Sequence, residues 1–109
     1  GTDDDALPLL VATTVATREQ ALALAREMVE RRLAACAQIT AIESIYRWQG
    51  AVEHEGEFRL LFKTRASAYG RLEAALRARH PYELPAIHAI ATTQADAAYA
   101  EWVRDSCDG

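Results

Sequence analysis

Hydrophobic and polar positions along this chain change their spacing several times, which predicts strands alternating with helices. The apolar run Leu7–Thr14 is typical of a short buried strand. From Thr17 onward the spacing becomes helical, and Thr17 with Gln20 forms the pattern of a capping box at the helix start. The core-facing stripe expected for this helix consists of Leu22, Ala25, Val29 and Leu33, with Ala21 and Met28 beside it.

The middle of the chain alternates with a period of two, which predicts two long strands joined by a tight turn. The first strand is expected from Cys36 to Trp48 and the second over Val52–Thr64. The turn is expected at Gln49-Gly50, because glycine accepts the positive φ that a two-residue hairpin turn requires. The apolar phase of the first strand slips near Thr40–Ala41, which predicts a bulge or kink there.

The last third of the chain predicts a helix, a proline corner, a short strand and one further helix. Ser67 is the expected N-cap of the first of these helices, which must end before Pro81 because residues preceding proline avoid the helical region. The corner His80–Pro85 then leads into a strand over Ala86–Thr92. Asp96 is the expected cap of the final helix.

This order of elements is that of the split βαβ, or ferredoxin-like, arrangement. We therefore expect an α+β βαββαβ sandwich with an extra C-terminal helix, as a single domain over residues 1–109 in which residues 1–6 form a disordered or non-native tail. The hairpin strands are more than twice the usual strand length of about five to six residues, and a long exposed edge invites another chain. We expect an oligomer built by sheet extension, with Tyr46 and Trp48 at the subunit contact, rather than a solvated arm.

Composition narrows the possible partners. The net charge is -4 and lysine and arginine form no run, which argues against nucleic acid or an acidic membrane surface as a partner. No apolar stretch approaches the length of a membrane span. The two cysteines, Cys36 and Cys107, do not form a disulfide framework, so we expect a reducing, cytoplasmic setting. Because no local signature of an enzyme is present, we expect a non-enzymatic protein.

Three side chains are candidate ligands of a metal ion. Cys36 offers a soft thiolate, although a small buried apolar residue is the more common role of a lone cysteine. His80 and Glu83 flank the proline corner, where a histidine beside a carboxylate ligates a metal, moves a proton or only shapes the turn.

Cationic side chains offer a different site. Lys63 lies at the end of a predicted strand and would bind an anion together with Arg65 and Arg79 if the strand ends converge. A metal site gathers neutral or anionic donors, whereas an anion site gathers cations and backbone N–H groups. The two hypotheses therefore require different residues to meet in space.

Several segments in combination resemble the CutA family of divalent-cation tolerance proteins. The resemblance implies a ferredoxin-like subunit, a homotrimer joined through the long hairpin and a link to copper and other divalent cations. It also implies a trimer similar to the PII proteins, so a sensor of a small anionic ligand is the alternative function. The segments are Leu33-Ala34-Ala35-Cys36, Ser44-Ile45-Tyr46-Arg47-Trp48-Gln49-Gly50, Lys63-Thr64, His80-Pro81-Tyr82-Glu83-Leu84-Pro85 and Tyr99-x-x-Trp102.

We further expect His80, Tyr82 and Glu83 to line a cleft at the corner, within a subunit or between subunits. The expected ligand-binding residues are Lys63, Arg79, Tyr82 and Thr13. Thr13 stands where some members have a cysteine, and Arg79 stands where some have a second histidine. Ala86 stands where many members have a glutamate. The chain thus lacks groups that a copper site would use, and the charge of Arg79 is expected to oppose a bound cation. We expect no obligatory cofactor and only weak binding of copper or another divalent cation, with Cys36, His80 and Glu83 as the ligands.

Overall fold

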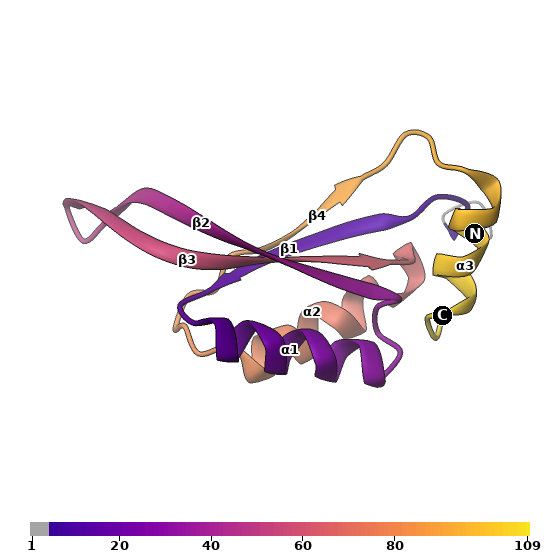
Figure 1. Ribbon diagram of the computed structural model, residues 1–109, viewed down its shortest axis with the longest axis horizontal. Coiled ribbons are helices and arrows are strands. Elements are labelled where there is room, and N and C mark those ends of the chain that lie inside the picture. The colour runs from indigo at the N-terminus through magenta and orange to yellow at the C-terminus, as the bar shows by residue number, and fades with distance from the viewer. Residues whose placement is uncertain (1–4) are drawn as a thin grey trace.

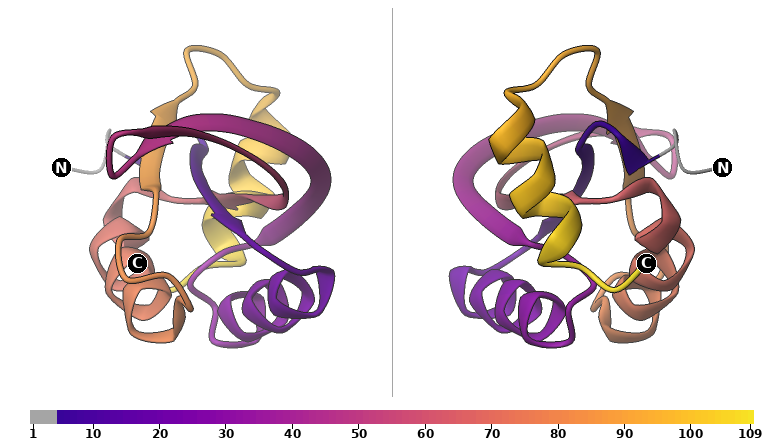
Figure 2. Two further views of the ribbon diagram at one scale, coloured as in Figure 1. Left: turned by 90° about the vertical axis from the view of Figure 1, so that its left-hand side faces the viewer. Right: turned by 90° about the vertical axis from the view of Figure 1, so that its right-hand side faces the viewer.

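The predicted order of strands and helices is confirmed by a computed structural model, which describes residues 5–109. The α+β ferredoxin-like fold has one sheet with α1 and α2 side by side on one of its faces, and α3 at one end of the sheet (Figure 1, Figure 2). No helix in the described part of the chain is long and apolar enough to cross a membrane. The elements are β1 (Leu9–Val15), α1 (Arg18–Glu30), β2 (Cys36–Trp48), β3 (Ala51–Thr64), the 3-10 turn η2 (Ala66–Ala68), α2 (Tyr69–Arg79), β4 (Ile87–Ala91) and α3 (Ala97–Asp105).

The four strands form one antiparallel sheet in the order β2-β3-β1-β4, so β2 and β4 are its outer strands. Thr13 in β1 pairs with Leu60 in β3 and with Ile87 in β4, which places these three side chains on one face of the sheet. That face packs against α1 and α2 and forms the core, whereas the opposite face, here called the open face, points away from both helices. The largest buried core side chains are Phe62, Met28, Leu60, Leu72, Leu76, Val11 and Val15.

The start of α1 agrees with its sequence pattern, but its core-facing side does not. Thr17 and Gln20 form the predicted capping box, with hydrogen bonds of 3.1 and 3.2 Å. Leu22 and Val29, however, are 48% and 36% exposed, because the helix packs through a second apolar series turned away from them. Alanine and leucine alternate so densely here that two stripes satisfy the helical period. The buried series is Ala21, Leu24, Ala25 and Met28.

The predicted capping role of Ser67 is wrong. Ser67 lies within η2, and α2 begins at Tyr69 with Ala68, which has no side-chain acceptor, at the N-cap. The backbone N–H and the hydroxyl of Ser67 both donate to the Asp5 carboxylate, at 2.9 and 2.8 Å. Of the tail predicted over residues 1–6, residues 1–4 lie outside the described part, whereas Asp5 is bound to the body of the fold. Asp96 caps α3 as predicted, accepting from the N–H of Tyr99.

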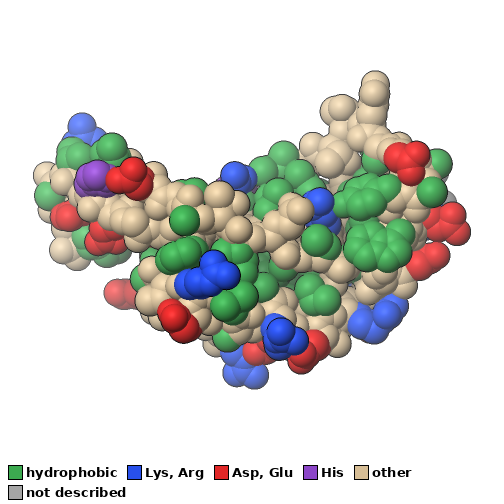
Figure 3. Space-filling model, viewed as in Figure 1, with side chains coloured by type: hydrophobic (Ala, Val, Ile, Leu, Met, Phe, Trp, Pro, Cys, Tyr) green, Lys and Arg blue, Asp and Glu red, His purple; other side chains and the backbone are tan. Residues whose placement is uncertain are grey.

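The β2–β3 hairpin is continuous from Cys36↔Lys63 to Trp48↔Ala51, so the predicted bulge near Thr40–Ala41 is wrong. Its turn has positive φ at both Gln49 (49°) and Gly50 (82°), as the sequence predicts. Pairing between β1 and β3 ends at Val15↔Phe58. Beyond that point the hairpin projects from the body as a two-stranded arm, and the molecule measures 45 × 26 × 22 Å (Figure 1, Figure 3).

Candidate functional site

The corner between α2 and β4 is built around His80, whose two ring nitrogens both make hydrogen bonds. The backbone N–H of Tyr82 donates to Nδ1 at 3.1 Å, so Nδ1 holds a lone pair and the neutral ring bears its proton on Nε2. Nε2 lies 2.9 Å from the carbonyl oxygen of Thr14 and 3.0 Å from the hydroxyl of Thr13. His80 therefore fastens the proline corner to the end of β1.

Tyr82 extends this attachment from the corner to the hairpin. Its ring centroid lies 5.0 Å from that of His80, and its hydroxyl donates to the Glu57 carboxylate at 2.7 Å. Glu57 is only 8% exposed, so the phenol is the hydrogen-bond partner of a buried carboxylate. Burial and the adjacent Glu57 charge raise the pKa of Tyr82, which keeps the phenol protonated and able to donate.

This arrangement does not offer His80 to a metal ion within one subunit. A histidine ligates a metal through a ring nitrogen lone pair, but the lone pair on Nδ1 already accepts from Tyr82 and Nε2 carries the proton. Burial lowers the pKa of His80, which keeps the ring neutral without releasing either nitrogen. Glu83 is exposed on the corner. Within residues 5–109, no group of three or more His, Cys, Asp or Glu side chains could hold a metal ion.

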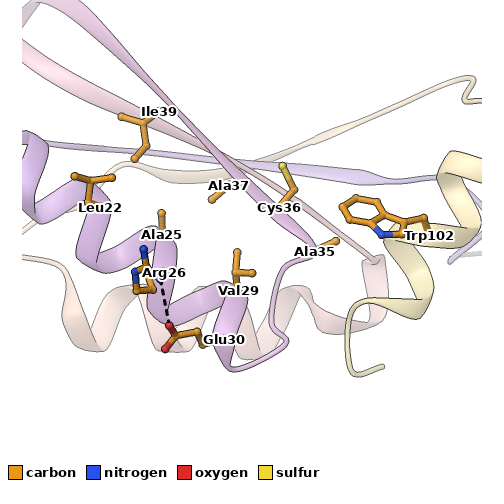
Figure 4. A pocket seen from close by; sticks show the side chains of 10 residues that line it. All are labelled: Leu22, Ala25, Arg26, Val29, Glu30, Ala35, Cys36, Ala37, Ile39 and Trp102. Carbon is orange, nitrogen blue, oxygen red and sulfur yellow. Dashed lines mark ion pairs between the residues drawn. The ribbon is translucent and has the colours of Figure 1, made fainter.

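Cys36 lies on the other face of the sheet from His80. Cys36 pairs with Lys63, which points to the open face because its neighbour Phe62 belongs to the core. His80 instead bonds to Thr13, which shares the helix-covered face with the core. Figure 4 shows the sulfur of Cys36 directed away from α1. The structure therefore does not bring the predicted ligands Cys36 and His80 together within the subunit.

Arg79, which was predicted to oppose a bound cation at the corner, contacts α1. Its Nε donates to the Glu27 carboxylate of α1 at 3.1 Å, and Arg31 donates to the same carboxylate at 2.8 Å. The guanidinium thus joins α2 to α1 through an ion pair with Glu27. Although Arg79 precedes His80 in the sequence, its side chain pairs with Glu27.

The other two cations of the predicted anion site are engaged elsewhere. Lys63 places Nζ 5.6 Å from the ring centroid of Tyr99, in a cation–π contact with α3. Arg65 forms an ion pair with Asp5, with 2.6 Å between Nη2 and the carboxylate. Since Arg79 pairs with Glu27, the three cations do not converge on one anion within the subunit.

Comparison with known proteins places the chain in a family. Residues 9–106 match the CutA1 divalent ion tolerance protein family. This chain belongs to the CutA1 family. It is 40% identical over 101 residues to the probable divalent-cation tolerance protein cutA homolog of Encephalitozoon cuniculi, which covers 93% of this chain and 89% of that protein. It is also 40% identical over 98 residues to CutA of Thermus thermophilus, covering 89% of this CutA1 chain and 95% of that protein.

Solved structures of the CutA1 family share the whole fold. CutA from Synechococcus elongatus is 41% identical, with a TM-score of 0.90 over 94% of this chain and 92% of that one. The Thermus thermophilus protein is 38% identical, with a TM-score of 0.89 over 94% of this chain and all of that one. The resemblance predicted from the sequence motifs is therefore confirmed, including the ferredoxin-like architecture.

This CutA1 subunit also has an apolar groove beside its outer strand β2. The groove measures about 470 Å³ and runs between α1 and the start of β2, where Trp102 of α3 closes one end (Figure 4). Leu22 and Val29, the exposed residues of α1, form part of its wall, and the Arg26–Glu30 ion pair lies at its rim. Tyr46 and Trp48, predicted for the subunit contact, lie on the arm and are 36% and 45% exposed in the single subunit.

Glu57 and Thr14 are the corner residues that sequence reasoning missed. In sequence, Glu57 is one of several acidic residues of the hairpin and carries no signal that distinguishes it from Glu53 or Glu55. It lies just beyond Phe58, where β1 stops pairing with β3, and there it is buried and accepts the hydrogen bond of Tyr82 from the corner. Thr14 contributes a backbone carbonyl, which no side-chain pattern reveals.

Proposed function

We propose that this CutA1 protein is a non-enzymatic homotrimer that contributes to tolerance of copper and other divalent cations. Its subunits join through the edges of their sheets. The observation that carries the proposal is the projecting arm: β2 and β3 pair with each other well beyond the point where β1 ends. A two-stranded ribbon without a packed face is marginal in water, so the arm requires a surface on another subunit.

The side chains on the arm support this contact. Ile45 is 71% exposed, Val52 64%, Trp48 45% and Tyr46 36%. Large apolar side chains concentrated on one projection mark a surface that is covered by a partner. Figure 3 shows the arm standing clear of the body, so these side chains have little to contact within their own subunit.

The open face of the sheet supports the same conclusion. Leu10 of β1 lies between Lys63 of β3 and Ile90 of β4, and Leu61 lies two residues from Lys63 on the same face. Ile90 is 38% exposed, and Leu10 and Leu61 are only partly buried. A face with apolar residues that neither α1 nor α2 covers is expected to pack against a neighbouring subunit.

The sheet edges give the assembly its symmetry. The outer strands β2 and β4 lie at opposite edges, so a contact of β2 in one copy with β4 in the next would join different surfaces. Such head-to-tail contacts close into a ring when the rotation per subunit divides a full turn. A ring of three follows if each copy turns by about 120°, the rotation of a threefold axis.

Cation binding in this proposal is weak and does not depend on a preformed centre within one chain. Support comes from the separation of Cys36 from His80 on opposite faces and from the occupied ring nitrogens of His80. Copper prefers soft donors, and the half-buried Cys36 is the soft donor closer to solvent, since Cys107 is buried. Both cysteines are free thiols, which supports placing the protein in a reducing compartment such as the cytoplasm.

Light scattering coupled to size exclusion tests the assembly. We expect three times the subunit mass of 12.0 kDa at micromolar concentration. Ile45→Glu should weaken the trimer, because it places a charge on the arm where a neighbour must pack. Ala74→Glu, on the exposed side of α2, is the matched control and should leave the mass unchanged. A monomer mass for the unchanged protein would refute the proposal.

A further inference from the structure

The last residue of α3 and the four residues after it, 105–109 and here called the latch segment, are held by arginines from distant parts of the chain. Arg32, in the turn after α1, donates from Nε to the Asp108 carboxylate and from Nη2 to the carbonyl of Asp105, both at 2.8 Å. The backbone carbonyl of Arg32 also accepts the N–H of Asp108 at 2.9 Å. One residue thus binds the latch segment through both its side chain and its backbone.

Two more arginines hold the backbone of the same segment. Arg71 of α2 donates to the carbonyl of Asp108 at 2.6 Å. Arg65, beside the end of β3, donates to the carbonyl of Cys107 at 3.4 Å, and its guanidinium lies against Gly109, where an added Cβ would come within 2.7 Å of the Arg65 carbon Cζ. The latch segment therefore contacts the turn after α1, the end of β3 and α2 at once.

These contacts enclose the thiol of Cys107. Cys107 is 3% exposed, and the Thr64 hydroxyl lies 3.7 Å from its sulfur. Burial raises the pKa of the Cys107 thiol, which lowers its thiolate fraction. Cys36, in contrast, is half-buried on the open face. The two thiols of one chain are therefore protected to different degrees, and only that of Cys107 depends on the latch segment.

The backbone of Arg32 is strained. Its φ is 60°, at the position after a helix end where glycine is favoured, and the N–H groups of Arg32 and Leu33 bond back to Val29 and Met28 of α1. A residue with a Cβ loses about 1 kcal/mol or more in this conformation. The strained residue is the one that binds Asp108 through both side chain and backbone, an association typical of a functional constraint.

The outer contacts of the latch segment are exposed to solvent. The side chains of Arg32 and Asp108 are 52% and 60% exposed, whereas those of Arg65 and Asp5 are 23% and 11% exposed. Exposed ion pairs contribute little stability and are screened by salt. A short segment held mainly by exposed contacts opens locally at a lower free energy than the whole fold.

From these contacts we infer that the latch segment, which carries Cys107, is releasable, that Arg32 and Arg71 limit its opening, and that opening exposes the Cys107 thiol. The chain then carries a conditional thiol, hidden when the latch segment is seated and reactive when it is released. Because Arg32 and Asp108 are exposed, ionic strength and competing charged partners set the fraction of open chains. The inference does not depend on the trimer or on cation binding.

Maleimide labelling tests the inference, with the rates at Cys36 and Cys107 separated by mass spectrometry of their peptides. Arg32→Ala and Arg71→Ala should each raise the labelling rate of Cys107 several-fold, and roughly five- to thirty-fold when combined, as for the loss of one to two kcal/mol. The rate at Cys36 should not change. Arg77→Ala removes an ion pair of α2 whose side chains are 58% and 38% exposed, and it serves as the matched control with no effect on either thiol.

The salt dependence of the labelling rate provides a second test. Raising the salt concentration should increase Cys107 labelling in the unchanged protein and have less effect in the Arg32→Ala/Arg71→Ala variant. Asp108→Asn removes only a charge and should accelerate the labelling of Cys107. It keeps the inference testable even if the Arg32→Ala/Arg71→Ala variant folds poorly. Unchanged Cys107 rates in all these variants, or equal acceleration of both cysteines, would overturn the inference, since equal acceleration means global rather than local opening.

Discussion

Cys36 and His80 lie on opposite faces of one sheet. Cys36 shares the open face with Lys63, and His80 is bonded to Thr13 on the face that α1 and α2 cover. A metal ion within a subunit cannot contact both, because the sheet itself stands between them. Any cooperation between the two residues in cation binding has to involve more than one subunit.

Calorimetric titration with copper is expected to show weak binding in which the two residues act independently. Cys36→Ser should lower the affinity further, and His80→Ala should change it little, since the ring nitrogens of His80 are occupied. In a double-mutant cycle the interaction between these substitutions should be close to zero. Tight binding that either single substitution abolishes would contradict this expectation.

Arg79→His should not improve copper binding, contrary to what the sequence alone suggests. The side chain of Arg79 extends toward Glu27 of α1. A histidine at this position is therefore expected to point toward α1 and not toward the ring of His80. The same titration measures the effect. A gain of about tenfold or more in affinity, equivalent to about 1.4 kcal/mol, would show that the corner rearranges to bind a metal.

Folding stability should fall as the pH drops below that of neutral water. Burial lowers the pKa of His80, although the Thr14 carbonyl and the Glu57 charge oppose the shift, whereas the unfolded chain has a pKa of about 6.5. The contribution of neutral His80 to folding stability is fully present above about pH 6.5. It is lost as the pH falls from there toward the pKa of His80 in the folded protein, because in this range only the unfolded chain takes up the proton. Urea unfolding at fixed protein concentration, between about pH 7.5 and about pH 5, measures the loss.

The pH effect has its own controls. His80→Gln keeps a donor and an acceptor in the side chain, so it should remove part of the pH dependence while retaining much of the corner. His54→Gln changes an imidazole on the arm that is 59% exposed and should leave the dependence in place. If both variants show the slope of the unchanged protein, His80 is not the group responsible.

Tyr82→Phe should destabilise the protein more than Tyr69→Phe. Each tyrosine donates to a carboxylate at 2.7 Å, Tyr82 to Glu57 and Tyr69 to Glu73. Glu57 is 8% exposed, so losing its donor leaves a buried carboxylate without this partner, at a cost of about 1–3 kcal/mol. Glu73 is only partly buried and water can replace the phenol, so the effect of Tyr69→Phe should be smaller. Equal changes in urea midpoint would show that burial of Glu57 does not matter.

Arg32→Gly and Arg32→Ala should differ although both remove the same side chain. Both lose the contacts with Asp105 and Asp108, but only glycine relieves the strain at φ 60°. The glycine variant should therefore be more stable than the alanine variant by about 1 kcal/mol. Urea denaturation of the two purified proteins gives the comparison, and an alanine variant as stable as the glycine variant would exclude strain at this residue.

Features set by neighbouring residues were predictable from the sequence. The capping box at Thr17 and Gln20 and the turn at Gln49-Gly50 each depend on a few adjacent positions. The face of Cys36 was not predictable, since it follows from the register between β2 and β3.

Side-chain contacts between residues far apart in the chain were equally unpredictable from the sequence. Arg79 meets Glu27, which is 52 positions away, and the sequence contains no signal for that pair. Glu57 meets Tyr82, which is 25 positions away, and no local pattern indicates that contact. The family motifs identified the corner His80–Pro85, but hydrogen-bond geometry was needed to show that His80 is already occupied.

The projecting arm has a consequence for how this protein responds to dilution. The parts of β2 and β3 that form the arm have no third strand beside them in the chain, so in the proposed trimer their order comes from association. Structure in the arm should then follow mass action: at low abundance the body persists while the tip around Gln49 and Gly50 frays, and at high abundance the tip becomes rigid. The rates of protease cleavage and amide hydrogen exchange in this one hairpin would then depend on the concentration of the protein.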